Sequence, residues 1–180
     1  MELCGKNPVL ERIKVRPDTI EKLYLQRDVN LSEIVKAANA SGVHFESKDK
    51  NWFKNEFKEM HTQGVVAFVK EFVYTDYQEV ISDCLKEKSI PVFLDNVTDP
   101  QNLGAIIRIL ACIGGYSIVI PEHGSSQVNS TVLRVANGGE NYLKIAKVIN
   151  IATSLKKIQD KGVVIFGTTV DGKQNVSEIK

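Results

Sequence analysis

The sequence predicts an α/β protein built from two modules, and three observations support this class. In the first half, short β-rich runs alternate with amphipathic helical patterns. In the second half, the strand-like runs are continuously apolar, as is typical of parallel strands covered by helices on both faces. A strand, a helix and a second strand also follow one another within about 30 residues, which indicates a right-handed βαβ unit.

The first module is expected to span residues 1–74. Its first helix, 7–15, is expected to begin with Asn7 as N-cap and Pro8 in the first helical position. Apolar residues at helical spacing predict a second helix at 30–40. The remaining predicted elements are strands at 21–26, 44–47 and 65–72, and a helix at 51–60.

A linker helix at 75–89 is expected to connect this module to a second one at 90–180. Residues 76–88 are amphipathic, and Pro91 follows shortly after them, which favours a boundary there. The predicted strands of the second module are 91–97, 117–120, 143–148 and 163–167, with a helix at 103–113 between the first two.

Charge and apolar patterning exclude several classes of protein. With 23 basic and 22 acidic residues, the chain has no overall field that attracts nucleic acid or membranes, so local patches must bind any charged partner. No apolar run approaches the roughly 20 residues of a membrane span, and the N-terminus lacks the apolar core of a signal peptide. We therefore expect a cytoplasmic protein without membrane contact.

The cysteines do not form a recognisable framework. Cys4, Cys84 and Cys112 are far apart and include no C-x-x-C pair, which argues against disulfides and against a zinc site. We expect three reduced packing residues and no bound metal.

The stretch 93–110 contains the clearest candidate site. Arg108 is expected to lean toward the N-terminus of helix 103–113, across Gly104, where no side chain obstructs it, and to end near Asn102. This turn follows the first strand of the module, at the edge where open α/β sheets bind ligands. Helix N-terminal amides and an arginine suit a phosphate or a developing oxyanion.

A structural interpretation explains the same spacing equally well. Asn102 could be only the N-cap of the helix, and Arg108 a surface residue that pairs with Asp95 or Asp99. From the spacing alone, both interpretations remain open.

Three motifs in the right order resemble the SpoU (TrmH-type) RNA 2′-O-ribose methyltransferases of the SPOUT superfamily. Residues 95–108 match the pattern D-x-x-x-D-P-x-N-x-G-x-x-x-R of the family's first catalytic motif. Residues 5–11 and 61–67 match G-x-N-P-V-L-E and H-x-Q-G-V-V-A of its substrate-binding domain. The resemblance covers most of the chain and is therefore specific.

The resemblance implies methyl transfer from S-adenosylmethionine to a ribose 2′-hydroxyl in rRNA or tRNA. It implies an N-terminal RNA-binding module and a Rossmann-like, normally knotted SPOUT domain. Asn102 and Arg108 would form the catalytic pair, with Arg108 binding the target phosphate or helping to deprotonate the hydroxyl. Gly167, Thr168 and Thr169 would lie at the edge of the cofactor pocket.

The catalytic domain of the family normally continues through two further motifs after the point where this sequence stops. The G-x-E-x-x-G and S-L-N motifs of the knot are absent, so we expect a C-terminally incomplete SPOUT domain that is inactive by itself. The family's homodimer, which forms through the knot, is put in doubt for the same reason. The nearest similar segment, 137–141, lacks the closing glycine, and we interpret Glu140 as part of a structural turn rather than as a catalytic residue.

Five residues of the first module are predicted to contact RNA: Lys6, Asn7, Arg12, His61 and Gln63. The alternative for the basic cluster around Arg12 is a solvated helix face, and for His61 a strand cap. The aromatic residues Trp52, Phe53 and Phe57 stand at helical spacing and are expected in the core rather than under a base.

Two other functions remain possible for the whole chain. A non-catalytic RNA-binding module or degenerate relative would keep the first module and lose the chemistry. A nucleotide-binding oxidoreductase is disfavoured because the sequence has no G-x-G-x-x-G turn.

Overall fold

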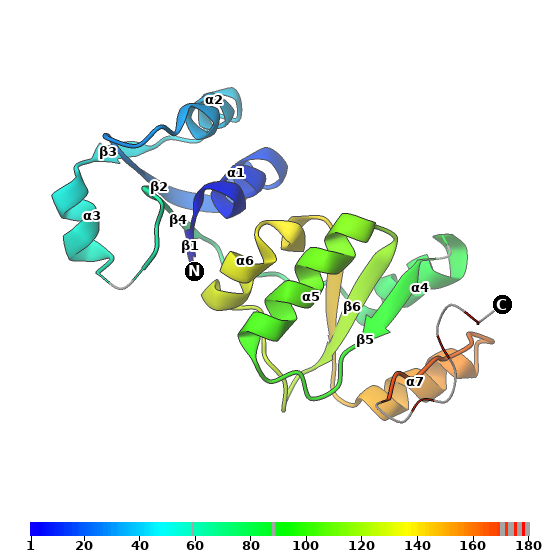
Figure 1. Ribbon diagram of the computed structural model, residues 1–180. Helices are drawn as coiled ribbons and strands as arrows, with labels where there is room; N and C mark the ends of the chain where they lie inside the picture. Colours follow the sequence, from blue (N-terminus) through cyan, green and yellow to red (C-terminus); the bar gives the residue numbers. More distant parts are fainter. Residues whose placement is uncertain (59, 88, 170–171, 173–174, 176–177, 179–180) are drawn as a thin grey trace.

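A computed structural model describes residues 1–58, 60–87, 89–169, 172, 175 and 178. It contains a four-stranded mixed sheet with strand order β1-β4-β2-β3 and a three-stranded parallel sheet with order β5-β6-β7 (Figure 1). The predicted α/β class with two modules and a parallel second sheet is confirmed. No helix in the described part of the chain is long and apolar enough to cross a membrane.

The first sheet separates two layers of side chains. Its strands are β1 (Glu2–Cys4), β2 (Ile20–Gln26), β3 (Glu46–Lys48) and β4 (Val65–Val69). The helices are α1 (Lys6–Val15), the 3₁₀ turn η1 (Pro17–Thr19), α2 (Ser32–Ala40) and α3 (Lys50–Glu56). Leu3, Leu23 and Ala67 share a face that packs with α1 and α2, because residues paired across neighbouring strands point to the same side of a sheet. The opposite face packs with α3 and the residues that follow it, through Cys4, Val66 and Phe53.

Two details of the first module differ from expectation. Helix α1 begins one residue earlier, and its N-cap is Gly5 at φ 102° rather than Asn7, because a glycine adopts this left-handed backbone at no steric cost. Helix α3 ends at Glu56 instead of continuing to residue 60.

The second sheet is covered on both faces. Its strands are β5 (Ile90–Phe93), β6 (Tyr116–Pro121) and β7 (Lys144–Val148). Its helices are α4 (Tyr77–Glu87), α5 (Pro100–Ile113), α6 (Ser130–Ala136), the 3₁₀ turn η2 (Gly139–Asn141) and α7 (Ile151–Gln159). Ile118 and Ile120 belong to the core with α5 and α6, whereas Val119 belongs to the core with α4 and α7. The continuous apolar pattern of β6 follows from this double burial.

Helix α4, within the segment predicted as a linker, has a buried face. Val80 and Ile81 pack with Val119 and Ala146, so α4 is a structural part of the second module.

The prediction of a strand at 163–167 is wrong. This segment is irregular, and no neighbouring strand of the described chain pairs with it. Val164 and Phe166 are 71% and 61% exposed, whereas Val163 packs against the core of the second module. An apolar run alone does not form a strand, because a strand also needs hydrogen bonds to a neighbouring strand, and this segment makes none in the described chain. The expected incompleteness of this domain stays a prediction.

Gly104 has a different role from the one expected. A Cβ atom at this position would lie 2.7 Å from Val135 Cβ and 2.9 Å from the Val132 carbonyl oxygen. The glycine therefore allows α5 to pack closely on α6, and it does not open a path for Arg108.

We predict that Gly104→Val destabilises the fold by about 1–3 kcal/mol, because the added methyl groups overpack the contact between α5 and α6. The matched control is Ala105→Val on the exposed side of the same helix, which should cost only the helix propensity of valine, about 0.5 kcal/mol. Urea denaturation measures both. Equal losses in the two variants would contradict the close packing at Gly104.

Candidate active site and nucleic-acid interface

The carboxyl ends of the three parallel strands form a polar edge. After β5, Asn96 adopts a left-handed backbone at φ 56°, and its Oδ1 lies 3.9 Å from the position of a Cβ on Gly124, in the loop after β6. The Ser126 amide of that loop donates to the Val97 carbonyl at 2.8 Å. After β7, Asn150 caps α7 by accepting from the Thr153 amide at 2.8 Å. The loops are thus tied to one another next to the start of α5.

Helix α5 begins at this edge with a side-chain cap. Asp99 accepts a hydrogen bond from the Gln101 amide at 2.8 Å, and Pro100 occupies the first helical position. Asn102 is therefore the third residue of the helix rather than its N-cap, and it is exposed. Its amide side chain is available at the positive end of the helix dipole.

Arg108 is exposed on the same helix. Among the described residues it forms no ion pair, so the alternative pairing with Asp95 or Asp99 is wrong. It follows Asn102 by six residues, about 9 Å along the axis, and long helical side chains lean toward the N-terminus. The structure thus leaves an exposed guanidinium without an ion-pair partner among the described residues, in the second half of the helix that begins at this polar edge.

Four of the five residues predicted to contact RNA lie together. Lys6, Asn7, His61 and Gln63 line one open groove of about 750 Å³ on the first module. The Lys6 amide donates to Gln63 Oε1 at 2.9 Å, and Lys6 Nζ donates to the Asn30 carbonyl at 3.1 Å. The loop before β4 is thereby fixed to the start of α1, which gives the groove a defined shape.

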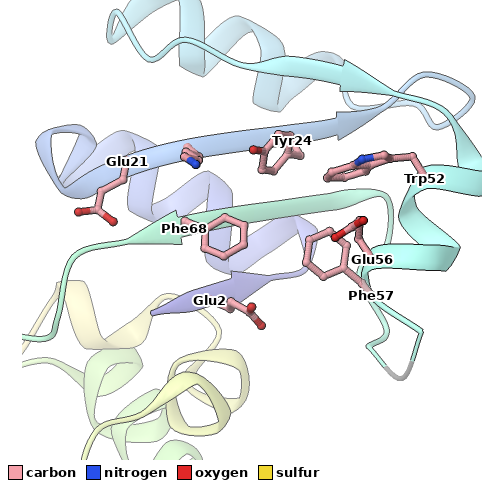
Figure 2. Close-up of a pocket in the computed structure, with 8 residues that line it drawn as sticks. Glu2, Glu21, Tyr24, Trp52, Glu56, Phe57 and Phe68 are labelled. Atoms are coloured by element: carbon pink, nitrogen blue, oxygen red, sulfur yellow. The ribbon is translucent and has the colours of Figure 1, made fainter.

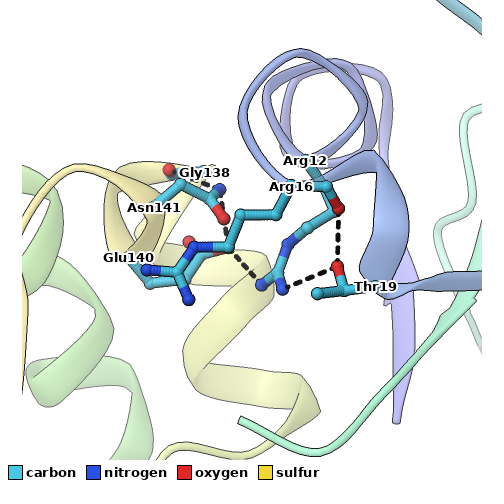
Figure 3. Close-up of polar contacts among 6 residues, drawn as sticks. All are labelled: Arg12, Arg16, Thr19, Gly138, Glu140 and Asn141. Carbon is cyan, nitrogen blue, oxygen red and sulfur yellow. Dashed lines mark hydrogen bonds and ion pairs between the residues drawn. The ribbon is translucent and has the colours of Figure 1, made fainter. Parts of the chain in front are cut away.

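The prediction that Arg12 contacts RNA is wrong, because Arg12 is buried. It is 3% exposed, and its Nη2 forms an ion pair with Glu140 Oε1 at 2.9 Å (Figure 3). A second nitrogen, Nη1, lies 3.4 Å from Thr19 Oγ1. A buried guanidinium with a carboxylate partner cannot contact RNA phosphates.

Glu140 is buried inside the turn that the sequence identified as structural. Burial raises the pKa of this carboxyl, and the Arg12 guanidinium opposes the increase. Oε1 also accepts a hydrogen bond from Asn141 Nδ2 at 3.1 Å. The pair joins α1 of the first module to η2 of the second.

This turn also contacts the helix that carries Arg108. A Cβ at Gly139 would lie 3.2 Å from the Arg108 Cα and from the Ala111 Cβ, and a Cβ at Gly138 would lie 2.6 Å from the Glu11 Cβ. The two glycines therefore let η2 fit between α1 and α5. Sequence reasoning missed this arrangement, although the position of Arg12, three residues after buried Val9, was a signal of burial.

Gly167, Thr168 and Thr169 lie in an irregular and exposed segment. The hydrogen bond described for them is between the Gly172 amide and the Thr169 carbonyl at 3.2 Å. Within the described part of the chain, they do not form a closed site with Asn102 and Arg108.

Comparisons with known proteins agree with this architecture. The model of the SpoU rRNA Methylase family matches residues 89–180. The model described as RNA 2′-O ribose methyltransferase substrate binding matches residues 3–75. Together the two matches include the groove, the start of α5 and η2.

Individual relatives are similar over most of this chain. The 23S rRNA (guanosine-2′-O-)-methyltransferase RlmB of Ralstonia nicotianae is 29% identical over 177 residues, which cover 97% of this chain and 71% of the relative. An uncharacterized tRNA/rRNA methyltransferase of Synechocystis is 30% identical over 153 residues, which cover 84% of this chain and 40% of that protein.

A solved structure shares the fold. The SpoU methyltransferase AviRb from Streptomyces viridochromogenes, crystallised with AdoMet, superposes with a TM-score of 0.68 at 16% identity. The match covers 90% of this chain and 59% of AviRb, so this chain spans less than two thirds of that protein.

Proposed function

Because the chain belongs to the SpoU rRNA methylase family, we propose that it serves methyl transfer from S-adenosylmethionine to a ribose 2′-hydroxyl in rRNA or tRNA. The observation that carries the proposal is the exposed Arg108, unpaired within the described residues, on the helix α5 that begins at the carboxyl edge of the parallel sheet. The names of the relatives, which include a guanosine-2′-O-methyltransferase, support the same reaction.

The chemistry requires a fixed positive charge. A ribose hydroxyl is a poor nucleophile at neutral pH, and its oxygen becomes more negative as the proton leaves. The Arg108 guanidinium stabilises this charge, or holds the adjacent phosphate so that the hydroxyl is oriented. The N-terminus of α5 and Asn102 add hydrogen-bond donors in the same region.

S-adenosylmethionine supplies the methyl group when it is bound. The residues expected beside its adenosine, Gly167, Thr168 and Thr169, are exposed, and within the part of the chain that the structure describes they do not enclose a ligand. They do not fit a donor site as they stand, and we derive no catalytic step through them.

The groove on the first module is the proposed RNA-binding surface. Lys6 supplies a positive charge for the phosphate backbone, whereas Asn7, His61 and Gln63 supply hydrogen-bonding groups for an unpaired base. An RNA partner is consistent with the cytoplasmic location expected from the sequence. The absent knot motifs put the family's homodimer in doubt for this chain, and sedimentation velocity tests whether it forms.

We predict that Lys6→Gln weakens RNA binding and reduces the dependence of log affinity on log salt by about one unit, because one phosphate contact is lost. Lys36→Gln, at an exposed position of α2 outside the groove, is the matched control. Titration of labelled RNA at several salt concentrations measures both slopes. Identical slopes for the two variants would remove the groove from the RNA interface.

The test of the reaction is transfer of tritium from labelled S-adenosylmethionine into total rRNA and tRNA by a chain extended at its C-terminus to the length of its relatives, because Gly167, Thr168 and Thr169 do not by themselves fit a donor site. We expect the label in 2′-O-methylated nucleosides after nuclease digestion. RNA binding without any transfer would instead favour the second candidate, a non-catalytic RNA-binding module, which the groove supports independently of the site on α5.

A further inference from the structure

A second concave surface lies on the first module, on the face of the sheet that α1 and α2 do not cover. It is a pocket of about 360 Å³ whose walls are the aromatic rings of Tyr24, Trp52, Phe57 and Phe68 (Figure 2). Its charged lining consists of Glu2, Glu21, Lys22 and Glu56. Nothing in the proposed methyl transfer uses these residues.

The register of the sheet explains how the pocket forms. Phe68 of β4 stands opposite Glu2 of β1 and opposite Lys22 of β2, so these side chains form one row across the sheet. Helix α3 covers only the other end of this face, where the Trp52 ring lies 4.9 Å from the Tyr24 ring. The space between the row and α3 remains open.

The aromatic residues only partly follow the core prediction. Phe53 is 4% exposed and belongs to the core, as expected. Trp52 and Phe57 are only half-buried, and their remaining surface faces the pocket (Figure 2). Trp52 and Phe57 were expected in the core, but each is buried on one side only.

The charge of the pocket favours a cation. Three carboxylates stand against one ammonium group, and none of these carboxylates has an ion-pair partner among the described residues. The aromatic wall already accepts a cation from its own chain, since Lys48 Nζ lies 5.4 Å from the Trp52 ring centroid. Lys48 is neutralised by Glu46 at 2.7 Å, so it does not cancel the excess of carboxylates.

The negative charge of this pocket argues against RNA as its ligand. Carboxylates repel phosphates, and any contact of a nucleic acid with Glu21 or Glu56 would require their charges to be screened. A base could stack on an aromatic wall, but the phosphates of its nucleic-acid strand would then lie among the acidic side chains.

We propose that this pocket binds an arginine side chain from a basic segment of a partner protein. A guanidinium stacks on aromatic faces and donates in a planar fork to carboxylates, which an ammonium cannot do. The acidic groups come from β1, β2 and α3, and this spread fits several basic residues along a chain better than a single small cation. The site is independent of methyl transfer.

The sole tryptophan of the chain makes the site directly observable, because Trp52 lines the pocket. We expect its fluorescence to change in a saturable way when an arginine–glycine repeat peptide is added. The same peptide with neutral citrulline in place of arginine should have no effect. High salt should weaken the interaction.

Charge variants locate the binding. The double variant Glu21→Gln/Glu56→Gln should reduce peptide affinity by about five- to tenfold, as expected for two exposed ion pairs. The matched control, Asp28→Asn/Glu71→Gln, removes two exposed carboxylates outside the pocket and should leave affinity unchanged. All four positions are exposed, so both variants should fold, which circular dichroism checks.

Three results would overturn the proposal. Equal binding of the arginine and citrulline peptides would exclude recognition of a guanidinium. Equal losses in the two double variants would place the peptide elsewhere. A single acetylated arginine amide that binds as tightly as the peptide, or an RNA oligonucleotide that produces the same fluorescence change, would replace the protein partner by another ligand.

Discussion

Replacing Arg108 with alanine is expected to lower the turnover rate of RNA methylation by about a hundred- to a thousandfold, the loss typical of one fixed charge that stabilises a developing oxyanion. The fold should not change, because Arg108 is exposed and forms no ion pair among the described residues. Arg108→Lys should recover part of the rate, since an ammonium keeps the charge but loses the planar fork.

The measurement is a single-turnover assay at saturating RNA with the C-terminally extended chain, together with an RNA titration. Arg134→Ala, an exposed arginine on the adjacent helix α6, is the matched control and should leave the rate unchanged. If Arg108→Ala weakens RNA binding but keeps the rate at saturation, the guanidinium binds a phosphate and does not act on the hydroxyl. A full rate with full affinity would remove Arg108 from the site.

Replacing Arg12 with methionine is expected to destabilise the protein by about 3–5 kcal/mol, because the Glu140 carboxylate would remain buried without its counter-ion. Urea denaturation measures this loss. The double variant Arg12→Met/Glu140→Met removes both charges and should be more stable than Arg12→Met. If Arg12→Met is as stable as the wild-type protein at neutral pH, the ion pair has no role in holding α1 against η2.

The stability of Arg12→Met should also depend on pH in a defined direction. Burial raises the pKa of Glu140 above its ordinary value of 4.5 even with Arg12 present, and removal of the cation raises this pKa further. A raised carboxyl pKa favours the folded state at low pH. The variant should therefore recover stability below pH 4.5 relative to the wild type, and lose it as pH rises through the raised pKa. The double variant should lack this pH dependence.

Long periodic patterns predicted most of the fold, because burial of an apolar face is determined locally. The apolar residues of α5 specified a helix, and the continuous apolar run of β6 specified a strand covered on both sides. The pattern at 163–167 was equally apolar but formed no strand, since a strand also requires a neighbour that supplies hydrogen bonds. No local pattern contains that information.

Only the part of the candidate site that lies on one helix could be predicted from the sequence. Asn102 and Arg108 lie on one helix, so their spacing in sequence determines their spacing in the structure. The partner of Arg12 is 128 residues away, and the role of Gly104 depends on Val135 of another helix. Both contacts arise from tertiary packing, which residue spacing does not reveal.

The fit of η2 between α1 and α5 has a consequence for substrate selection. Helix α1 contributes Lys6 and Asn7 to the groove, and α5 carries Arg108, so the distance between the two surfaces is set by side-chain contacts rather than by a flexible tether. A nucleotide that is several positions nearer to, or farther from, the feature held in the groove would miss Arg108. If the groove binds RNA as proposed, this fixed spacing would select the target nucleotide by its distance along the folded RNA from the feature held in the groove.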